Sequence, residues 1–269
     1  MSTRDRSAPR SAPQPDSYLV RFTDTPQGRM RSRTLGPAGD EAPHVVAVQG
    51  MAVSEYLLPA LTALSDRART HLVDLPGLAG SGPATELLDV PGYAAAVTAW
   101  LDAADLPPVV LVGHSSSTQV VARVAVARPR RVRALVLASP TVDPAVRSWP
   151  RLILQWRRDS RYPLPGLQQQ HTPEWVRAGA RQLRNLVSVH LRDHLEDVIG
   201  AVRCPVLVLR GEHDEVSTES WARSLADLAP EGRFEAVPGP HTFVWSHPTA
   251  WCTPIHDLIS RAWDAPAQG

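Results

Sequence analysis

The chain has 269 residues, 43% of them hydrophobic, and a formal net charge of +1 at pH 7. This favours one α/β domain with an insertion, or two small domains, and excludes a disordered or fibrous chain. The near-balanced charge argues against a general nucleic-acid-binding role, and no apolar run approaches the ~20 residues that span a membrane. The two cysteines, Cys204 and Cys252, lie far apart and outside any CxxC pattern, so we expect two buried thiols and no disulfide framework or zinc site.

The first 16 residues, MSTRDRSAPRSAPQPD, are rich in Arg, Ser and Pro and lack the hydrophobic stretch of a secretion signal. This composition predicts a disordered tail over residues 1–16. With neither a secretion signal nor a membrane span in the sequence, we expect a cytoplasmic protein.

Strand-like and helix-like segments then alternate along the chain. The segments YLVRFTD and MRSRTLG predict an antiparallel pair of strands, and HVVAVQG, THLVDLPG, PVVLVG and RVRALVLAS are short apolar runs typical of buried strands. Helical patterns lie between them, with Ser54 at an expected N-cap and Pro91 in an expected first turn. This alternation predicts an α/β fold: a mostly parallel central sheet of about eight strands, flanked by helices.

The alternation breaks between about Pro140 and Gly200, where the pattern is helical and no strand-like run occurs. It returns with the strand-like segments CPVLVLRG and RFEAVPG and a last helix near Pro248–Trp263. We therefore expect a core built from residues 17–140 and 201–265, with a helical cap over residues 141–200.

The most informative stretch is Gly113-His114-Ser115-Ser116-Ser117, which follows the strand PVVLVG. It fits the pattern G-x-S-x-small, in which a sharp strand-to-helix turn exposes the hydroxyl of the middle serine. A serine hydroxyl is a weak nucleophile, so it needs a base within hydrogen-bond reach and a carboxylate to orient that base. The alternative is a plain turn whose hydroxyls cap the next helix.

The later chain offers both partners. Asp214 follows the strand VLVLRG, and His241 follows the strand RFEAVPG in a loop rich in Gly and Pro. Since the carboxyl ends of parallel strands lie on one edge of a sheet, we expect Ser115, Asp214 and His241 to converge there. Asp143, which follows the strand RVRALVLAS, is the rival acid, although its place before Pro144 is also typical of a turn.

These motifs resemble those of the α/β-hydrolase family, from about Tyr18 to Trp263: GHSSS is similar to the nucleophile turn, DLPGLAGSG to the loop after the fourth strand, GEHD to the acid loop and PGPHTF to the histidine loop. The resemblance implies that the backbone N–H groups of Met51 and Ser116 form the oxyanion hole. The sequence departs from the family's motifs in two places. Ser117 stands where the nucleophile turn has its second glycine, and Gln49-Gly50 stands where the family often has His-Gly after the third strand.

Other polar and aromatic residues have competing interpretations. We expect His114 to pack beneath the turn, His247 to cap the last helix, and the i, i+4 pair His190 and His194 to lie on a solvated helix face rather than bind a metal. The candidates for a substrate pocket are Gln49, Trp149, Trp156 and Trp175; the tryptophans could equally attach the cap to the core.

The sequence thus predicts a serine hydrolase acting on a carboxylic ester, thioester or lactone, with no metal or organic cofactor. Its expected partner is a small, apolar or aromatic substrate rather than nucleic acid or a membrane, and the chain is expected to be a monomer or homodimer. A C–C bond hydrolase or cofactor-free perhydrolase would use the same residues, and a non-hydrolytic cyclase or lyase, or a silent ligand receptor, could share the scaffold.

Overall fold

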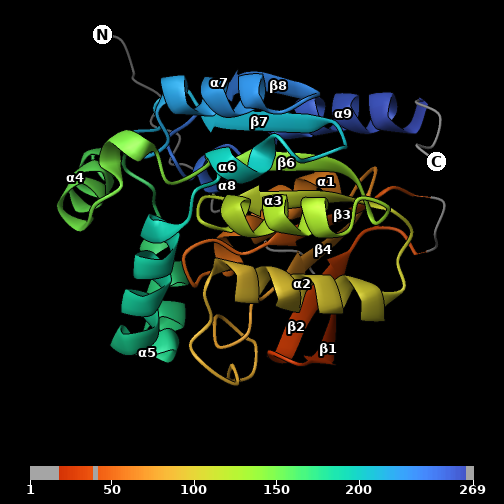
Figure 1. The fold of residues 1–269 in the computed structure, drawn as a ribbon, viewed down its shortest axis with the longest axis horizontal. Helices are drawn as coiled ribbons and strands as arrows, with labels where there is room; N and C mark the ends of the chain where they lie inside the picture. Colours follow the sequence, from red (N-terminus) through yellow and green to blue (C-terminus); the bar gives the residue numbers. More distant parts are fainter. Residues whose placement is uncertain (1–17, 39–41, 265–269) are drawn as a thin grey trace, which may run out of the picture.

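An eight-stranded sheet forms the centre of the protein (Figure 1). The structure is a computed structural model that describes residues 18–38 and 42–264. The strands are β1 (Leu19–Thr25), β2 (Gly28–Leu35), β3 (His44–Val48), β4 (Arg69–Val73), β5 (Val109–His114), β6 (Val132–Ala138), β7 (Val206–Gly211) and β8 (Gly232–Val237). Their order in the sheet is β1-β2-β4-β3-β5-β6-β7-β8. The tail expected over residues 1–16 lies outside the described residues.

The sheet is mostly parallel, as the sequence predicts. The strands β1 and β2 form the expected antiparallel pair, β2 joins β4 antiparallel, and every neighbouring pair from β4 to β8 is parallel. The central strands β3 and β5 are buried throughout, because helices cover both faces of the sheet. Alternate side chains of β3 therefore enter different cores: Val46 and Val48 face one, Val45 and Ala47 the other.

Helices cover these two faces. They are η1 (Glu55–Leu57), α1 (Leu58–Leu64), α2 (Val90–Ala104), α3 (Ser117–Ala127), η2 (Pro144–Val146), α4 (Trp149–Asp159), α5 (Leu167–Arg192), α6 (Glu196–Ile199), α7 (Glu219–Leu228), α8 (Phe243–Ser246) and α9 (Cys252–Asp264). Buried side chains of α2, α3 and α7 pack on one face, and those of α1, α8 and α9 on the other.

Ser54 is the N-cap residue of the 3-10 helix η1, as predicted, but its side chain makes no capping bond; its hydroxyl lies 2.6 Å from an Arg33 nitrogen. The predicted cap at His247 is wrong. His247 lies before the start of α9, where its Nδ1 contacts the hydroxyl of Ser246. Pro91 does fall in the first turn of α2, where Asp89 accepts a hydrogen bond from the Gly92 N–H.

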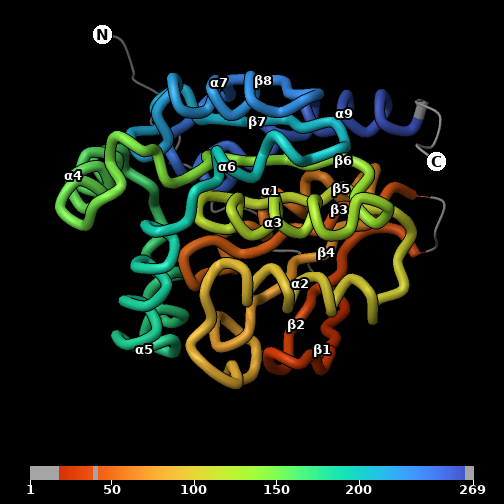
Figure 2. Tube along the Cα trace, viewed as in Figure 1, coloured from red at the N-terminus to blue at the C-terminus, as the bar shows by residue number. Residues whose placement is uncertain are grey.

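Between β6 and β7 the chain forms η2, α4, α5 and α6 and no strand. Figures 1 and 2 show α4 and α5 projecting together at one end of the sheet. Pro173 lies inside α5, and Gly179 breaks its helical geometry with φ 75° and ψ 159°. The two halves of α5 therefore approach different parts of the core: residues near 171–175 face the loop after β3, and residues near 182–190 face α2 and α3.

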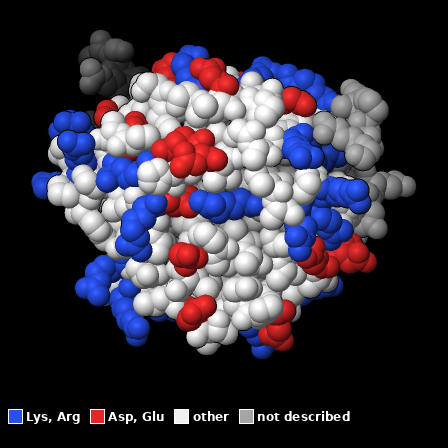
Figure 3. All heavy atoms as spheres, in the orientation of Figure 1, with Lys and Arg blue, Asp and Glu red and all other residues white. Residues whose placement is uncertain are grey.

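One face of the molecule carries its charges in a mixed pattern (Figure 3). On the face shown in Figure 3, basic and acidic side chains are interspersed among uncharged ones. No helix within the two described ranges combines the length and apolar character needed to cross a bilayer. Cys204 and Cys252 are free thiols, but both are half-buried rather than buried as predicted, and burial raises their pKa values to about 12 and about 11.

Candidate active site

The backbone of the turn after β5 is strained at Ser115, as expected of a turn that exposes the hydroxyl of its middle serine. Ser115 has a positive φ of 58°, which a residue with a side chain adopts only where the surroundings hold it. The preceding Gly113 is required by close packing, because a Cβ there would lie 2.6 Å from Val121 Cγ2 and 2.8 Å from the Ser117 carbonyl oxygen. The turn thus presents Ser115 at the carboxyl end of the sheet.

The three consecutive serines have three different surroundings. The Ser115 hydroxyl contacts His241. The Ser116 hydroxyl accepts a hydrogen bond from the backbone N–H of Met51 at 2.9 Å. The Ser117 hydroxyl donates to the Val48 carbonyl at 2.9 Å and accepts from the His114 N–H at 2.9 Å, so it fastens the turn to β3. The hydroxyl of Ser117, where the resemblance expects a second glycine, is thus small enough for this turn and is fully hydrogen-bonded.

Ser115, His241 and Asp214 form a continuous hydrogen-bonded relay. The distance from Ser115 Oγ to His241 Nε2 is 2.9 Å, and both carboxylate oxygens of Asp214 lie 3.0 Å from His241 Nδ1. Asp214 Oδ1 also accepts the backbone N–H groups of Val216 and Ser217, each at 2.8 Å, which fixes the carboxylate. The structure thus brings together, at one edge of the sheet, the three side chains that the sequence analysis expects to converge there.

The electrostatics of the pair favour a charged carboxylate beside the imidazole. Burial raises the pKa of Asp214, but the attraction and hydrogen bond of His241 outweigh this and hold the pKa below its ordinary value. Burial lowers the pKa of His241, and Asp214, with a smaller contribution from Asp159, raises it above its ordinary value of 6.5. A carboxylate in this position stabilises the imidazolium form of the ring.

His114 lies beneath the turn, as predicted, and is uncharged. Burial and the neighbouring His241 lower its pKa to about 3. Its Nε2 lies 3.0 Å from the His241 carbonyl oxygen, which can only accept, so Nε2 carries the proton. Its Nδ1 therefore accepts from the Tyr56 hydroxyl at 2.7 Å. This neutral ring supports the backbone of the loop that carries His241.

A cavity of about 430 Å³ opens beside Ser115 and His241. Its walls are mainly apolar and come from the helical insertion and the loop after β3, with Trp156, Trp175, Leu164 and Leu167 among them. His171 also lines it; burial lowers the pKa of this ring to about 4, and its Nε2 has no hydrogen-bond partner among the described residues.

Two of the four predicted pocket residues do not line this cavity. Gln49 is only 1% exposed, and its side-chain oxygen accepts the Leu75 N–H at 2.9 Å, so it joins the loops after β3 and β4. Trp149, at the start of α4, is 38% exposed and is not among the residues that line the cavity. Trp156 and Trp175 do line it.

Asp159 is a residue of the site that the sequence analysis missed. It is the last residue of α4, is 8% exposed, and lines the cavity. Its Oδ1 accepts the backbone N–H of His241 at 3.1 Å and that of Glu215 at 3.3 Å. Burial raises its pKa, which the attraction of His241 opposes. No local pattern marks it, because its role depends on where α4 ends above the sheet.

The insertion also contacts the loop that contains Met51. Trp175 donates its indole N–H to the Met51 carbonyl at 3.0 Å, and the Glu174 carboxylate accepts the Ser54 N–H at 2.7 Å. Glu174 and Ser54 belong to a buried polar cluster around Arg33 and Asp74, which lie 3.1 Å apart. These contacts fix the loop beside Ser116.

The remaining candidates lie outside the relay. Asp143 accepts hydrogen bonds from the Ala145 N–H at 2.8 Å and the Thr218 hydroxyl at 2.6 Å, and so begins the turn of η2. His190 is buried, not solvated as predicted, and its Nδ1 contacts the Gln119 side-chain oxygen. His194 is exposed and follows the end of α5, so the two rings do not share a helix face.

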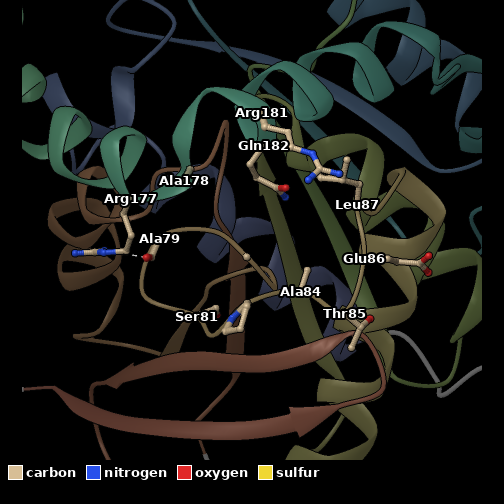
Figure 4. A pocket seen from close by; sticks show the side chains of 12 residues that line it. Ala79, Ser81, Ala84, Thr85, Glu86, Leu87, Arg177, Ala178, Arg181 and Gln182 are labelled. Atoms are coloured by element: carbon tan, nitrogen blue, oxygen red, sulfur yellow. Dashed lines mark hydrogen bonds between the residues drawn. The ribbon is translucent and has the colours of Figure 1, made fainter.

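A second cavity, of about 600 Å³, lies between residues 77–87 and residues 177–182 in the middle of α5 (Figure 4). Arg177 crosses its rim and donates to the Ala79 carbonyl at 2.8 Å. Neither Ser115 nor His241 lines this cavity, so it is separate from the relay.

The fold and the relay together define the class of an α/β hydrolase. The model of the alpha/beta hydrolase family matches residues 45–253, and the chain belongs to this family.

Individual relatives are distant. A (lyso)-N-acylphosphatidylethanolamine lipase from Mus musculus is 26% identical over 132 residues, which are 46% of this chain and only 38% of the relative. An enol-lactonase from Burkholderia xenovorans LB400 has 15% identity and a TM-score of 0.70 over 89% of this chain and all of its own (100%). A carboxylesterase from Bacillus subtilis has 18% identity and a TM-score of 0.67 over 91% and 92%. At these identities the two structures show the shared fold alone.

Proposed function

We propose that this chain is a serine hydrolase that cleaves a carboxylic ester, thioester or lactone of a small molecule. The observation that carries the proposal is the 2.9 Å contact between Ser115 Oγ and His241 Nε2, with Asp214 3.0 Å from the other ring nitrogen. A nucleophile, a base and an orienting carboxylate in this geometry are the parts that acyl transfer requires.

In the first half of the reaction, His241 Nε2 takes the hydroxyl proton of Ser115 as Oγ attacks the carbonyl carbon. Asp214 stabilises the imidazolium that forms. The N–H groups of Met51 and Ser116 donate to the oxyanion, which replaces the Ser116 hydroxyl as the acceptor for Met51. One such donor contributes about 3–4 kcal/mol to transition-state stabilisation. The bond from the carbonyl carbon to the leaving oxygen or sulfur then breaks, and His241 returns the proton to the leaving group.

In the second half, water attacks the acyl-Ser115 carbonyl while His241 takes its proton. The acid leaves, and the proton returns to Ser115 Oγ, so the resting enzyme is restored. The apolar cavity with Trp156 and Trp175 supports an apolar or aromatic substrate. Proteins named lipase, lactonase and carboxylesterase share this fold, which is compatible with hydrolysis of an ester or lactone.

A fluorophosphonate probe tests the proposal on the purified protein. We expect stoichiometric labelling at Ser115, located by peptide mass, and complete loss of label in Ser115→Ala. Ser224→Ala, on α7, is the matched control and should label like the wild type. A folded protein that takes no label would overturn the proposal and favour a non-hydrolytic cyclase, a lyase or a ligand receptor on this scaffold.

A further inference from the structure

Two cavities of very different size meet at Ser115. The larger, of about 430 Å³, is the pocket described above, and the smaller has about 10 Å³. Ser115, Met51 and Trp156 line both, so they stand between the two spaces. A void of about 10–15 Å³ holds roughly one water molecule, and therefore little more than a methyl group.

The walls of the small cavity are buried and closely packed. They include Val142, Leu152 and Val187, which are 3%, 3% and 6% exposed. These side chains belong to one apolar cluster that also contacts Met51 and Trp156. Because protein interiors are close-packed, this space widens only if its walls move.

His241 distinguishes the two cavities chemically. It lines the larger one, and the residues that line the smaller one do not include it. In the proposed mechanism the base returns its proton to the leaving group, which must therefore lie beside His241. The acyl group bonds to the same carbon but extends away from the leaving group, on the far side of Ser115.

We infer that the substrate is an ester of a short acyl group, of acetyl size, with a bulky apolar or aromatic alcohol. The acyl group occupies the small cavity bounded by Leu152 and Val187, and the alcohol occupies the 430 Å³ pocket. This assignment rests on the proposed function and adds to it the direction in which the ester binds.

Two isomeric esters test the assignment. The compounds 2-phenylethyl acetate and methyl 3-phenylpropanoate contain the same atoms but divide them oppositely between acyl group and alcohol. We expect kcat/KM, followed by acid release in a pH-stat, to be at least about tenfold higher for the acetate, since overfilling a packed site by a few methylenes costs this much or more. We also expect kcat/KM for 2-phenylethyl butanoate to be lower than that for 2-phenylethyl acetate by at least about tenfold.

Variants then connect the preference to the cavity. Leu152→Ala, and independently Val187→Ala, should raise the ratio of butanoate to acetate activity. Leu164→Ala, in the larger cavity, should leave that ratio unchanged. Circular dichroism checks that each variant is folded, and the isomer comparison needs no variant at all.

The outcomes separate this inference from the proposed function. If Ser115 is labelled, three results would overturn the assignment of the cavities but leave the nucleophile in place. They are a preference for the propanoate, equal rates for the two isomers, and no turnover of either ester. No label at Ser115 overturns the proposed function itself.

Discussion

The carboxylate of Asp159, at the end of α4, accepts the backbone N–H of His241 at 3.1 Å. The same oxygen accepts the N–H of Glu215, the residue after Asp214. One side chain of the insertion thus joins the loops that carry the acid and the base. It acts in two separable ways: its oxygen holds the backbone, and its negative charge favours the protonated form of His241.

Asp159→Asn separates these two effects. His241 must be neutral to act as a base, so activity falls as the pH falls through its pKa, which is raised above the ordinary value of 6.5. The asparagine keeps an acceptor oxygen but loses the charge, so the pKa of His241 should fall. We expect the acid limb of kcat/KM to move to lower pH, with the plateau nearly unchanged; a pH–rate profile measures this.

Asp159→Ala provides the comparison. It removes both the charge and the acceptor of two backbone N–H groups, so the plateau should drop by about 10–150-fold, the equivalent of about 1.5–3 kcal/mol for a hydrogen bond to a charged group. If the asparagine variant had an unmoved acid limb, the charge of Asp159 would not act on His241.

The choice between Asp214 and Asp143 as the acid of the relay has a direct test. Asp214→Asn should lower kcat by about 10⁴-fold, since an amide favours the wrong tautomer of the base. Asp143→Asn should retain activity within about threefold, because this side chain contacts the Ala145 N–H and the Thr218 hydroxyl rather than His241. Steady-state kinetics on an activated ester measure both, and equal losses would contradict the assignment.

The sequence was sufficient to predict the framework of the site. Continuous apolar strands predict a parallel sheet, and polar residues directly after its strands must then gather at one edge. Ser115, Asp214 and His241 each follow a strand, so their convergence required no knowledge of the loops.

Some residues were predicted less well because their surroundings depend on distances along a helix and on packing between elements. Trp149 and Trp156 are seven residues apart and so share a face of α4, but they lie about 10 Å apart along its axis. The cavity reaches only the end with Trp156 and Asp159. Similarly, the spacing of His190 and His194 implies one helix face only if the helix continues, whereas α5 ends at Arg192.

Trp175 connects the insertion to the predicted oxyanion loop through its bond to the Met51 carbonyl at 3.0 Å. Trp175→Phe keeps an aromatic wall for the cavity but removes this donor. We expect kcat to fall by about fivefold, the equivalent of about 1 kcal/mol for one hydrogen bond, with a smaller change in KM. Trp149→Phe, on the exposed start of α4, is the control and should change neither constant. A loss confined to KM would indicate that Trp175 serves the pocket alone.

The last prediction concerns stability. Arg33, on β2, is fully buried and contacts the Ser54 hydroxyl at 2.6 Å, a carboxylate oxygen of Asp74 at 3.1 Å, and Glu55. Arg33→Met removes the cation and leaves the buried Asp74 carboxylate with less compensation, which costs about 3–5 kcal/mol of unfolding free energy. Urea unfolding measures this loss.

Arg29→Met on the same strand is the matched control. Its ion pair with Asp24 has a 3.8 Å separation and lies in solvent, with side chains 61% and 88% exposed. Exposed pairs of this kind contribute about 0–1 kcal/mol, because water screens the charges and the side chains lose entropy on pairing. The two variants delete the same charge from the same strand. A difference between their losses of unfolding free energy therefore measures the effect of burial on the contribution of the arginine. Equal losses of unfolding free energy would show that the cluster around Arg33 is no more important to the fold than a surface pair.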